Sequence, residues 1–350
     1  MQKRRLGRTD IDVSVICLGT MTYGEQNTEA EGHAQMDMAL DRGVNFLDAA
    51  ELYAIPPRPE TQGRTEEIIG AWFKARGNRD KVIMATKVVG RTDMNWFRDD
   101  GGRAKLDRRN IEEAIDKSLR RLRTDYIDLY QLHWPDRTIM WGSNPTVYVP
   151  SPRAADEVPI EETMGVLADI VATGKVRHIG LSNESAWGTM RAVFAAERGL
   201  GPRPQSIQNA YHLVNRTFET ALAEIAEREQ VGLLAYSPLA QGYLTGKYRN
   251  GALPPASRKA LFDRLQRYEK PGAVEAYEAY LTLADELALD PAQMSIAFAA
   301  SRPFTTSVII GATTPTQLEA NLAAIDAVPM TPELVGRINA IHQFTMNRAP

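Results

Sequence analysis

The chain has 350 residues, of which 43% are hydrophobic, and its 41 basic and 44 acidic side chains give a formal net charge of −3. A chain of this length and apolar content can bury a large core, and one barrel domain fits it as well as two smaller domains. The charges are mixed along the sequence without a long basic run, so nucleic acid is not expected as a partner. The single cysteine, Cys17, excludes a disulfide framework and a CxxC site, and we predict no bound metal.

The first residues, MQKRRLGRTDIDVSVICLG, contain a twin arginine that could belong to an export signal. Asp10 and Asp12 interrupt the apolar segment that such a signal needs. No run approaches the roughly 18 apolar residues that span a bilayer. We therefore expect a cytoplasmic protein without a membrane partner, in which residues 1–13 form a short hairpin that closes the bottom of a barrel.

Short runs rich in β-branched and apolar residues recur along the chain and predict parallel strands. They are Val15–Gly19, Val44–Asp48, Val82–Lys87, Tyr126–His133, Val176–Ser182, Gln205–Gln208, Gly232–Ser237 and Ser307–Gly311. Segments of helical period lie between them. In one such segment Asp107 can cap the start and the apolar positions share one face: Ile111, Ile115, Leu119 and Leu122. Eight strands with helical connections favour a closed (β/α)8 TIM barrel over an open doubly wound sheet.

Two further segments lie outside this repeat. Residues 136–159, with prolines around Trp141 and Tyr148, predict a long loop after the fourth strand. Thr331–Phe344 has the apolar spacing of a C-terminal helix. No linker rich in Gly, Ser or Pro separates domains, so residues 1–350 are predicted to form a single domain.

Polar side chains follow the ends of the predicted strands, where the working residues of a (β/α)8 barrel lie. A single rim Lys or His is more often merely solvated, but several together favour a site. An Asp, a Tyr, a Lys and a His suit the protonation of an oxygen that becomes negative when hydride reaches a carbonyl carbon. Lys87 is a candidate ammonium for lowering the pKa of a tyrosine, with Asp48 holding it and neutral His133 binding the substrate oxygen.

Several motifs then follow one another in the order known from one family. They are DAAELY from Asp48 to Tyr53, TKV at Lys87, DYIDLYQLHWP around His133, IGLSN ending at Asn183, QNAYHL from Gln208, AYSPL around Tyr236 and GATTPTQLEAN from Gly311. Together they resemble the motifs of the aldo-keto reductases over essentially the whole chain. The segments PPRPETQG and QNTEAE resemble the Tas-type branch, which is related to the potassium-channel β-subunit branch.

The resemblance implies a catalytic tetrad of Asp48, Tyr53, Lys87 and His133. Tyr53 would be the general acid in the reducing direction and the general base in reverse. The implied cofactor is NADPH/NADP+. The resemblance places Ser182, Asn183 and Gln208 at the nicotinamide carboxamide, Tyr236 against its ring, and Lys247 and Arg258 along the pyrophosphate. The cofactor set is Thr20, Met21, Asp48, Ser182, Asn183, Gln208, Tyr236, Ser237, Pro238, Leu239, Gln241, Gly242, Lys247, Arg258, Gly311, Thr313, Gln317 and Asn321.

Two positions depart from the family pattern near the adenosine. Ala320 stands where many relatives carry a glutamate, and Gln317 replaces an arginine that other branches use on the 2′-phosphate. NADPH is still favoured over NADH because Lys247, Arg258 and Thr313 can offer charge and a hydroxyl, and no acidic residue is evident for a free ribose diol.

The substrate is expected to be a small carbonyl compound, an aldehyde or ketone. The loop aromatics Tyr23, Trp96, Trp141 and Tyr148 are candidates for its pocket. An alternative function is an NADPH-binding regulatory or redox-sensing subunit with slow turnover. His133 favours an enzyme, since the channel-associated branch differs there. A barrel hydrolase would need an acidic partner that Asp48 lacks. Oligomeric state is left open.

Overall fold

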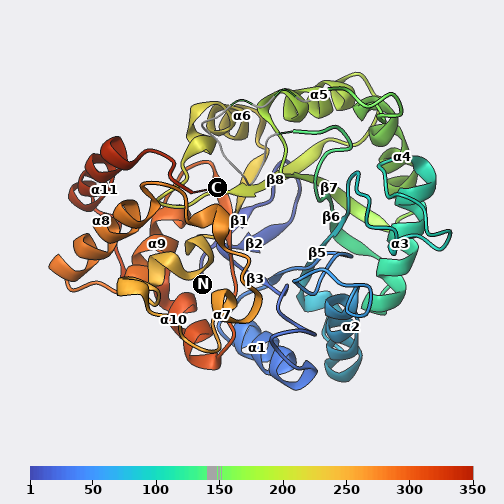
Figure 1. Ribbon diagram of the computed structural model, residues 1–350. Coiled ribbons are helices and arrows are strands. Elements are labelled where there is room, and N and C mark those ends of the chain that lie inside the picture. The colour runs from blue at the N-terminus through green and yellow to red at the C-terminus, as the bar shows by residue number, and fades with distance from the viewer. Residues whose placement is uncertain (140–147, 149, 151, 350) are drawn as a thin grey trace.

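A closed barrel of eight parallel strands forms the centre of the computed structural model, which describes residues 1–139, 148, 150 and 152–349 (Figure 1). The strands run in the order β10-β3-β4-β5-β6-β7-β8-β9 and close on themselves. Their bounds are β3 Ile16–Gly19, β4 Phe46–Asp48, β5 Ile83–Val88, β6 Ile127–Leu132, β7 Val176–Ser182, β8 Pro204–Ala210, β9 Gly232–Tyr236 and β10 Thr305–Ile310. The predicted (β/α)8 barrel is confirmed.

Helices surround this barrel (Figure 1). In the described part of the chain they are α1 Glu29–Asp41, α2 Arg64–Arg76, α3 Arg108–Leu122, α4 Ile160–Ala172, α5 Ala186–Glu197, α6 Leu222–Glu229, α7 Arg258–Phe262, α8 Ala273–Glu286, α9 Pro291–Ala300, α10 Pro315–Ala327 and α11 Pro332–Thr345. No helix of the described residues is long and apolar enough to cross a membrane.

The third helix shows how the sequence sets an element. Asp107 precedes α3 and its side chain accepts a hydrogen bond from the backbone N–H of Asn110, which satisfies a donor at the helix start. The predicted apolar face is buried at Ile111, Ile115 and Leu122. This face packs on the outside of the barrel wall, as the helical period predicted.

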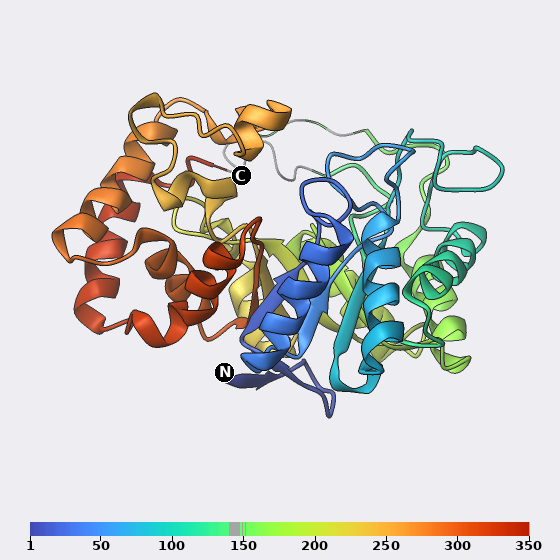
Figure 2. The ribbon, with the colours of Figure 1, turned by 90° about the horizontal axis from the view of Figure 1, so that it is seen from below.

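A two-stranded hairpin closes one end of the barrel interior. Its strands, β1 Lys3–Arg5 and β2 Asp12–Ser14, are antiparallel, so the hairpin reaches one residue beyond the predicted 1–13. Leu6 and Val13 are fully buried and pack with interior side chains that include Cys17 and Phe46. Figure 2 shows the hairpin at the lower end and the long connecting loops at the opposite end.

The remaining elements largely follow the predicted bounds. The β8 strand extends the predicted Gln205–Gln208 by one residue at its start and two at its end, and Pro204 occupies the first strand position, where a missing N–H is tolerated. The described residues of 136–159 contain no helix or strand, and α4 begins at Ile160. The side chain of Thr331 caps the predicted C-terminal helix, α11.

Candidate active site

The C-terminal ends of neighbouring strands bring the tetrad together. Asp48 ends β4, Lys87 lies near the end of β5, and His133 directly follows β6. Tyr53 lies in the turn after β4. Lys87 is fully buried, and the exposed fractions of the other three residues range from 2% to 9%. The site is therefore built where the barrel rule places working residues.

Lys87 is the centre of the tetrad's hydrogen bonds. Its Nζ donates to Asp48 Oδ2 at 2.6 Å and to the carbonyl oxygen of Ala49 at 2.7 Å. The third contact, to the hydroxyl oxygen of Tyr53, is 3.5 Å long. Although burial lowers the pKa of Lys87, the attraction of Asp48 and Tyr53 outweighs it, and the pKa is raised. Lys87 is therefore a charged ammonium held against the tyrosine.

The pKa of Tyr53 differs from the sequence-based expectation. Burial raises this pKa above its ordinary value, and the opposing effect of Lys87 is smaller. Lys87 does lower the pKa of Tyr53, as expected. The net pKa is nevertheless raised, because desolvation disfavours the phenolate more strongly than the ammonium favours it. Tyr53 is thus protonated at neutral pH, the form that a proton donor requires.

His133 faces Tyr53 edge-on, with ring centroids 5.7 Å apart. Burial, followed by repulsion from Lys87, lowers its pKa well below the ordinary value. The ring of Trp134 lies 4.9 Å from it, and the side chain of Asn183 donates to its carbonyl oxygen at 2.9 Å. A neutral imidazole fixed in this way can donate a hydrogen bond without carrying charge.

The second carboxylate oxygen of Asp48 accepts hydrogen bonds from two buried amides. Gln208 Nε2 lies 2.9 Å from Oδ1, and Gln131 Nε2 lies 3.1 Å from it. Gln131 is absent from the sequence-based site. A signal for it exists, because Gln131 is a polar residue in an apolar strand and lies two positions before His133, on the same face.

The residues predicted at the nicotinamide end lie beside the tetrad. The Ser182 hydroxyl donates to the carbonyl oxygen of Gln208 at 2.9 Å. Asn183, at φ 50°, accepts from the Tyr236 hydroxyl at 2.7 Å. Thr20 Oγ1 donates to the carbonyl oxygen of Asp48 at 2.8 Å. The structure therefore groups these side chains around one end of the tetrad.

The residues predicted for the pyrophosphate form a second group, which begins just after β9. Gln241 Nε2 donates to Ser237 Oγ at 2.7 Å, and Gln241 Oε1 accepts from Arg258. Burial and then repulsion from Arg258 lower the pKa of Lys247, and burial lowers that of Arg258. No carboxylate in the described part of the chain forms an ion pair with either cation.

At Gly242, φ is 102°, which L side chains rarely adopt. A Cβ at this position would lie 2.4 Å from Cε of Lys247, so glycine lets the lysine lie directly over the turn. Pro238 and Leu239 precede this turn, and Met21 packs against the apolar cluster around Tyr53.

A third group surrounds the start of α10. Gln317 is exposed, and its Oε1 accepts from the Thr313 N–H at 3.0 Å. Asn321 is buried and donates to the carbonyl oxygen of Gly311 at 3.2 Å. The carbonyl oxygen of Ala320 accepts from Gln293 at 3.0 Å. These residues form the α10 side of the predicted cofactor site.

The four aromatics predicted for the substrate pocket do not stay together. Trp96 packs against the cluster that contains Tyr53. Tyr148 is 81% exposed, and Trp141 lies outside the described residues. Tyr23 is fully buried and its hydroxyl donates to Gln35 at 3.1 Å. The prediction for Tyr23 is wrong, because this loop tyrosine turns back into the core beneath α1.

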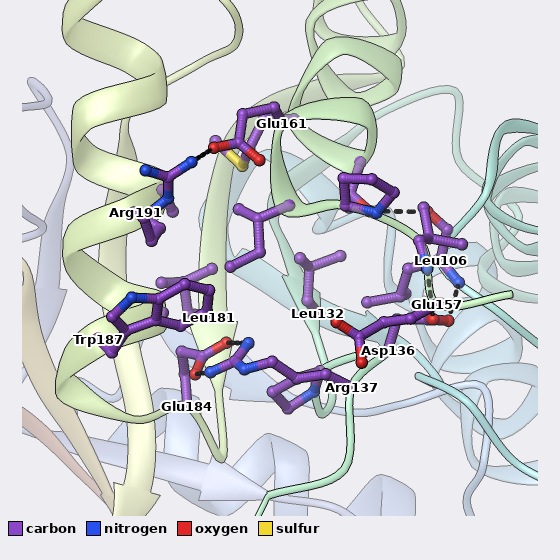
Figure 3. A pocket seen from close by; sticks show the side chains of 18 of the residues that line it. Leu106, Leu132, Asp136, Arg137, Glu157, Glu161, Leu181, Glu184, Trp187 and Arg191 are labelled. Carbon is purple, nitrogen blue, oxygen red and sulfur yellow. Dashed lines mark hydrogen bonds and ion pairs between the residues drawn. The ribbon is translucent and has the colours of Figure 1, made fainter. Parts of the chain in front are cut away.

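A cavity of about 280 Å³ lies on the outer side of the barrel between α4 and α5 (Figure 3). Leu132 and Leu181 line it, and each directly precedes a site residue on its strand. Because successive strand side chains point to opposite faces, His133 and Ser182 face the interior. The barrel wall therefore separates this cavity from the tetrad.

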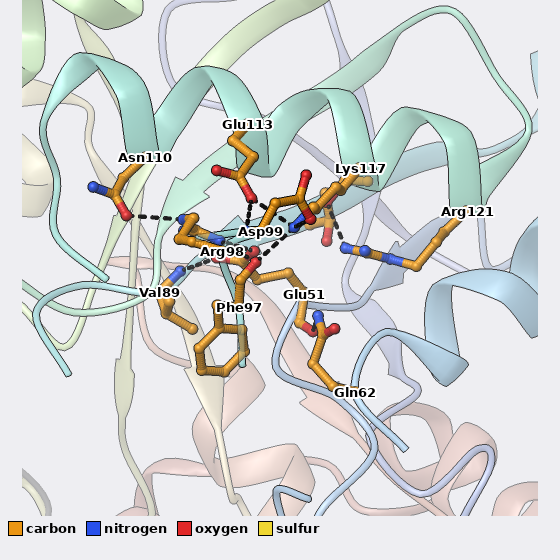
Figure 4. A network of polar contacts seen from close by, with 12 residues as sticks. Glu51, Gln62, Val89, Phe97, Arg98, Asp99, Asn110, Glu113, Lys117 and Arg121 are labelled. Carbon is orange, nitrogen blue, oxygen red and sulfur yellow. Dashed lines mark hydrogen bonds and ion pairs between the residues drawn. The ribbon is translucent and has the colours of Figure 1, made fainter. Parts of the chain in front are cut away.

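The sequence reasoning also missed a buried ion pair beside Tyr53 (Figure 4). Nη1 and Nη2 of Arg98 donate to the Glu51 carboxylate, at 2.9 and 3.1 Å, and both side chains are almost fully buried. Glu51 Oε1 also accepts from the Val89 N–H at 2.8 Å. Glu51 belongs to the DAAELY motif, but nothing in the motif indicates a partner 47 positions away.

Sequence comparison with known proteins identifies the family to which the chain belongs. The aldo/keto reductase family model matches residues 15–343. Over the full length of both chains, 45% of residues are identical to Protein tas of Escherichia coli (strain K12). A probable voltage-gated potassium channel subunit beta of Arabidopsis thaliana is 32% identical, with 99% of this chain and 98% of the relative covered. The uncharacterized oxidoreductase YrpG of Bacillus subtilis (strain 168) is 33% identical, with 97% and 96% covered. These matches confirm the resemblance to both branches, and the chain therefore belongs to the aldo/keto reductase family of oxidoreductases.

Proposed function

We propose that the protein is a cytoplasmic NADPH-dependent reductase of aldehydes or ketones, with Tyr53 as the proton donor. One observation carries the proposal: a buried, protonated tyrosine lies 3.5 Å from an ammonium that is fixed by a carboxylate. A neutral histidine faces the same tyrosine. This arrangement suits proton donation to an oxygen that gains negative charge.

The residues present fit a dinucleotide with several phosphates. Lys247 and Arg258 are partly desolvated cations without a carboxylate partner among the described residues, and an anionic group would compensate their charge. They would hold the phosphates, while Ser182, Asn183 and Gln208 would hold the nicotinamide amide and Tyr236 its ring. When bound, NADPH supplies the hydride.

Each tetrad side chain then has a distinct task. Tyr53 gives its proton to the carbonyl oxygen of the substrate. Lys87 stabilises the phenolate that this transfer leaves, and Asp48 keeps Lys87 charged and aimed. His133 donates a hydrogen bond to the same substrate oxygen and orients it. Trp96, which packs against the apolar cluster that contains Tyr53, supports an aromatic or apolar substrate.

The first experiment measures initial rates of NADPH absorbance loss with 4-nitrobenzaldehyde, beside NADH as the matched cofactor control. We expect turnover with NADPH and a lower kcat/KM with NADH. Tyr53→Phe should lower kcat by roughly 10²–10⁴-fold, the range for a lost general acid. The Kd for NADPH should change less than twofold. Equal rates in the two proteins would overturn the role of Tyr53.

A second candidate function is supported by the 32% identity to the potassium channel subunit beta. In this case the protein binds NADPH and acts as a regulatory or redox-sensing subunit with slow turnover. Tight NADPH binding, measured by fluorescence, without reduction of any aldehyde in a broad panel would favour this function over the reductase.

A further inference from the structure

Gln131 makes a polar contact to the tetrad that the proposed chemistry has not used. The side chain is fully buried, and its Nε2 donates to Asp48 Oδ1 at 3.1 Å. Its Oε1 accepts from Gln208 Nε2 at 3.1 Å, and that nitrogen also donates to Asp48 Oδ1. One carboxylate oxygen therefore faces Lys87 and the other faces a pair of amides.

The barrel geometry explains why these residues meet although they are far apart in the sequence. Asp48, Gln131 and Gln208 lie on β4, β6 and β8, and side chains from alternate strands form layers in a (β/α)8 barrel. Gly180 lies opposite Gln131 on the neighbouring strand β7. A Cβ there would lie 3.2 Å from Cγ of Gln131 and 2.7 Å from the Ser206 hydroxyl oxygen. Glycine at this position therefore leaves room for the Gln131 side chain.

From these contacts we infer that Gln131 is a positioning residue, which fixes the Asp48 carboxylate so that Lys87 stays aimed at Tyr53. The inference deepens the proposed function and rests on it for its catalytic meaning. Amide N–H groups bind the carboxylate and favour its charged form over the acid. Without Gln131, Asp48 Oδ1 keeps only the Gln208 amide as a donor, so the carboxylate is less firmly oriented toward Lys87.

Other charged and titratable groups face the same site and must stay constant in a test. Lys87 of β5 and Cys17 of β3 interact electrostatically with Asp48, and so does Tyr53 of the following turn. His133 after β6 faces Lys87, and Arg258 at the start of α7 acts on Tyr53. A substitution of Gln131 leaves all of these groups in place.

The test compares Gln131→Met, which keeps the length of the side chain, with the wild-type protein. Two readouts are needed. The first is the ¹³C chemical shift of the Asp48 carboxyl carbon at neutral pH, in protein labelled at aspartate and assigned with Asp48→Asn. The second is the pH profile of kcat with 4-nitrobenzaldehyde. We expect the Asp48 carboxyl chemical shift to change and kcat to fall about tenfold. The Kd for NADPH should stay within twofold.

Gln35→Met is the matched control, because Gln35 is 2% exposed and accepts a hydrogen bond from Tyr23 in the core. It should lower thermal stability without changing the Asp48 carboxyl chemical shift or the pH profile of kcat. Gln131→Asn, which shortens the amide by one methylene, should change both readouts in the same direction as Gln131→Met and serves if that variant does not fold.

An unchanged Asp48 carboxyl chemical shift in the Gln131 variants would overturn the inference, as would an equal change in Gln35→Met. Absence of turnover in the wild-type protein would instead contradict the proposed reductase. The carboxyl chemical shift would still decide whether Gln131 fixes Asp48, so the two failures are distinguishable.

Discussion

The DAAELY motif contains the acidic members of two buried ion pairs, Asp48 and Glu51. The two pairs differ in what the remaining N–H donors of the basic partner bind. Asp48 pairs with Lys87, and Glu51 pairs with Arg98; the exposed side-chain fraction is at most 3% in all four. Lys87 donates to Asp48 and to a backbone carbonyl and still reaches the Tyr53 hydroxyl. A compact ammonium thus contacts a fixed anion and the proposed proton donor together.

Arg98 instead donates its hydrogen bonds to groups that hold the fold together. It binds Glu51 with two nitrogens, Asn110 Oδ1 at 2.9 Å and the carbonyl oxygen of Phe97 at 3.2 Å. The planar guanidinium suits such fixed bidentate binding. The pair ties the turn that carries Tyr53 to the loop after β5 and to α3 (Figure 4). Both pairs are buried and charged, but only the first keeps a donor for chemistry.

The largest effect should come from Lys87→Met, which removes the ammonium from the catalytic pair. We expect kcat to fall by roughly 10³-fold, within the range for losing proton-transfer chemistry. The buried Asp48 carboxylate would lose its partner, so the free energy of unfolding should fall by about 3–5 kcal/mol. Single-turnover kinetics and urea unfolding measure the two effects.

Lys117→Met is the matched control for a lost lysine. Lys117 is also paired with a carboxylate, since its Nζ lies 2.6 Å from Glu113 Oε1, but both residues lie on α3, outside the tetrad. Its kcat should match the wild type. A kcat for Lys87→Met within tenfold of the wild type would remove the distinction between the two pairs.

The scaffold pair should show the reverse balance. Glu51→Gln leaves the buried Arg98 guanidinium without its counter-charge and should lower the free energy of unfolding by about 3–5 kcal/mol. Its loss of kcat should be smaller than that of Lys87→Met, because Tyr53 and Lys87 remain. The double variant Glu51→Met with Arg98→Met should recover part of the stability, since no unpaired charge is left. A greater loss of stability in the double variant would contradict this account.

His133 provides a smaller, pH-dependent test of the first pair. Burial and Lys87 lower its pKa well below the ordinary value in the folded protein, whereas the unfolded chain binds a proton near pH ~6.5. Between these two pKa values the unfolded state holds more protons, so stability is full above the unfolded pKa and is lost as pH falls. The slope contributed by this group is at most about 1.4 kcal/mol per pH unit.

Urea unfolding above and below pH ~6.5, for the wild type and His133→Asn, measures the contribution of His133 to the free energy of unfolding. The comparison with a variant is needed because burial also lowers the pKa of His178 and His342. The acid-side loss of stability should be smaller in His133→Asn than in the wild type. The same loss in both proteins would show that His133 is not held neutral by the site.

The sequence predicted the tetrad from two sources. The alternation of strands and helices indicates a barrel, and residues at strand ends such as Asp48 and Lys87 then share one rim. The inclusion of Tyr53, which lies beyond a strand end, rested on the resemblance of DAAELY to the family motif. The contacts of Gln131 and Arg98 depend on spatial neighbours 83 and 47 positions away, which no local pattern records. The net pKa of Tyr53 was equally out of reach, because it depends on how completely the phenol is desolvated.

Tyr23 shows the same limit and gives the smallest predicted effect. Its position in a loop after β3 suggested a pocket role, but loops on a barrel rim can also fold back over the core. Tyr23→Phe should leave kcat and the KM for 4-nitrobenzaldehyde within twofold of the wild type. Stability should fall by only about 1 kcal/mol, because Gln35 loses one hydrogen-bond donor.

Trp96→Ala is the contrasting variant. It should raise the KM, because Trp96 packs against the apolar cluster that contains Tyr53. A raised KM in Tyr23→Phe with normal stability would mean that substrate reaches this tyrosine. Tyr23 would then belong to the substrate pocket and not to the core beneath α1.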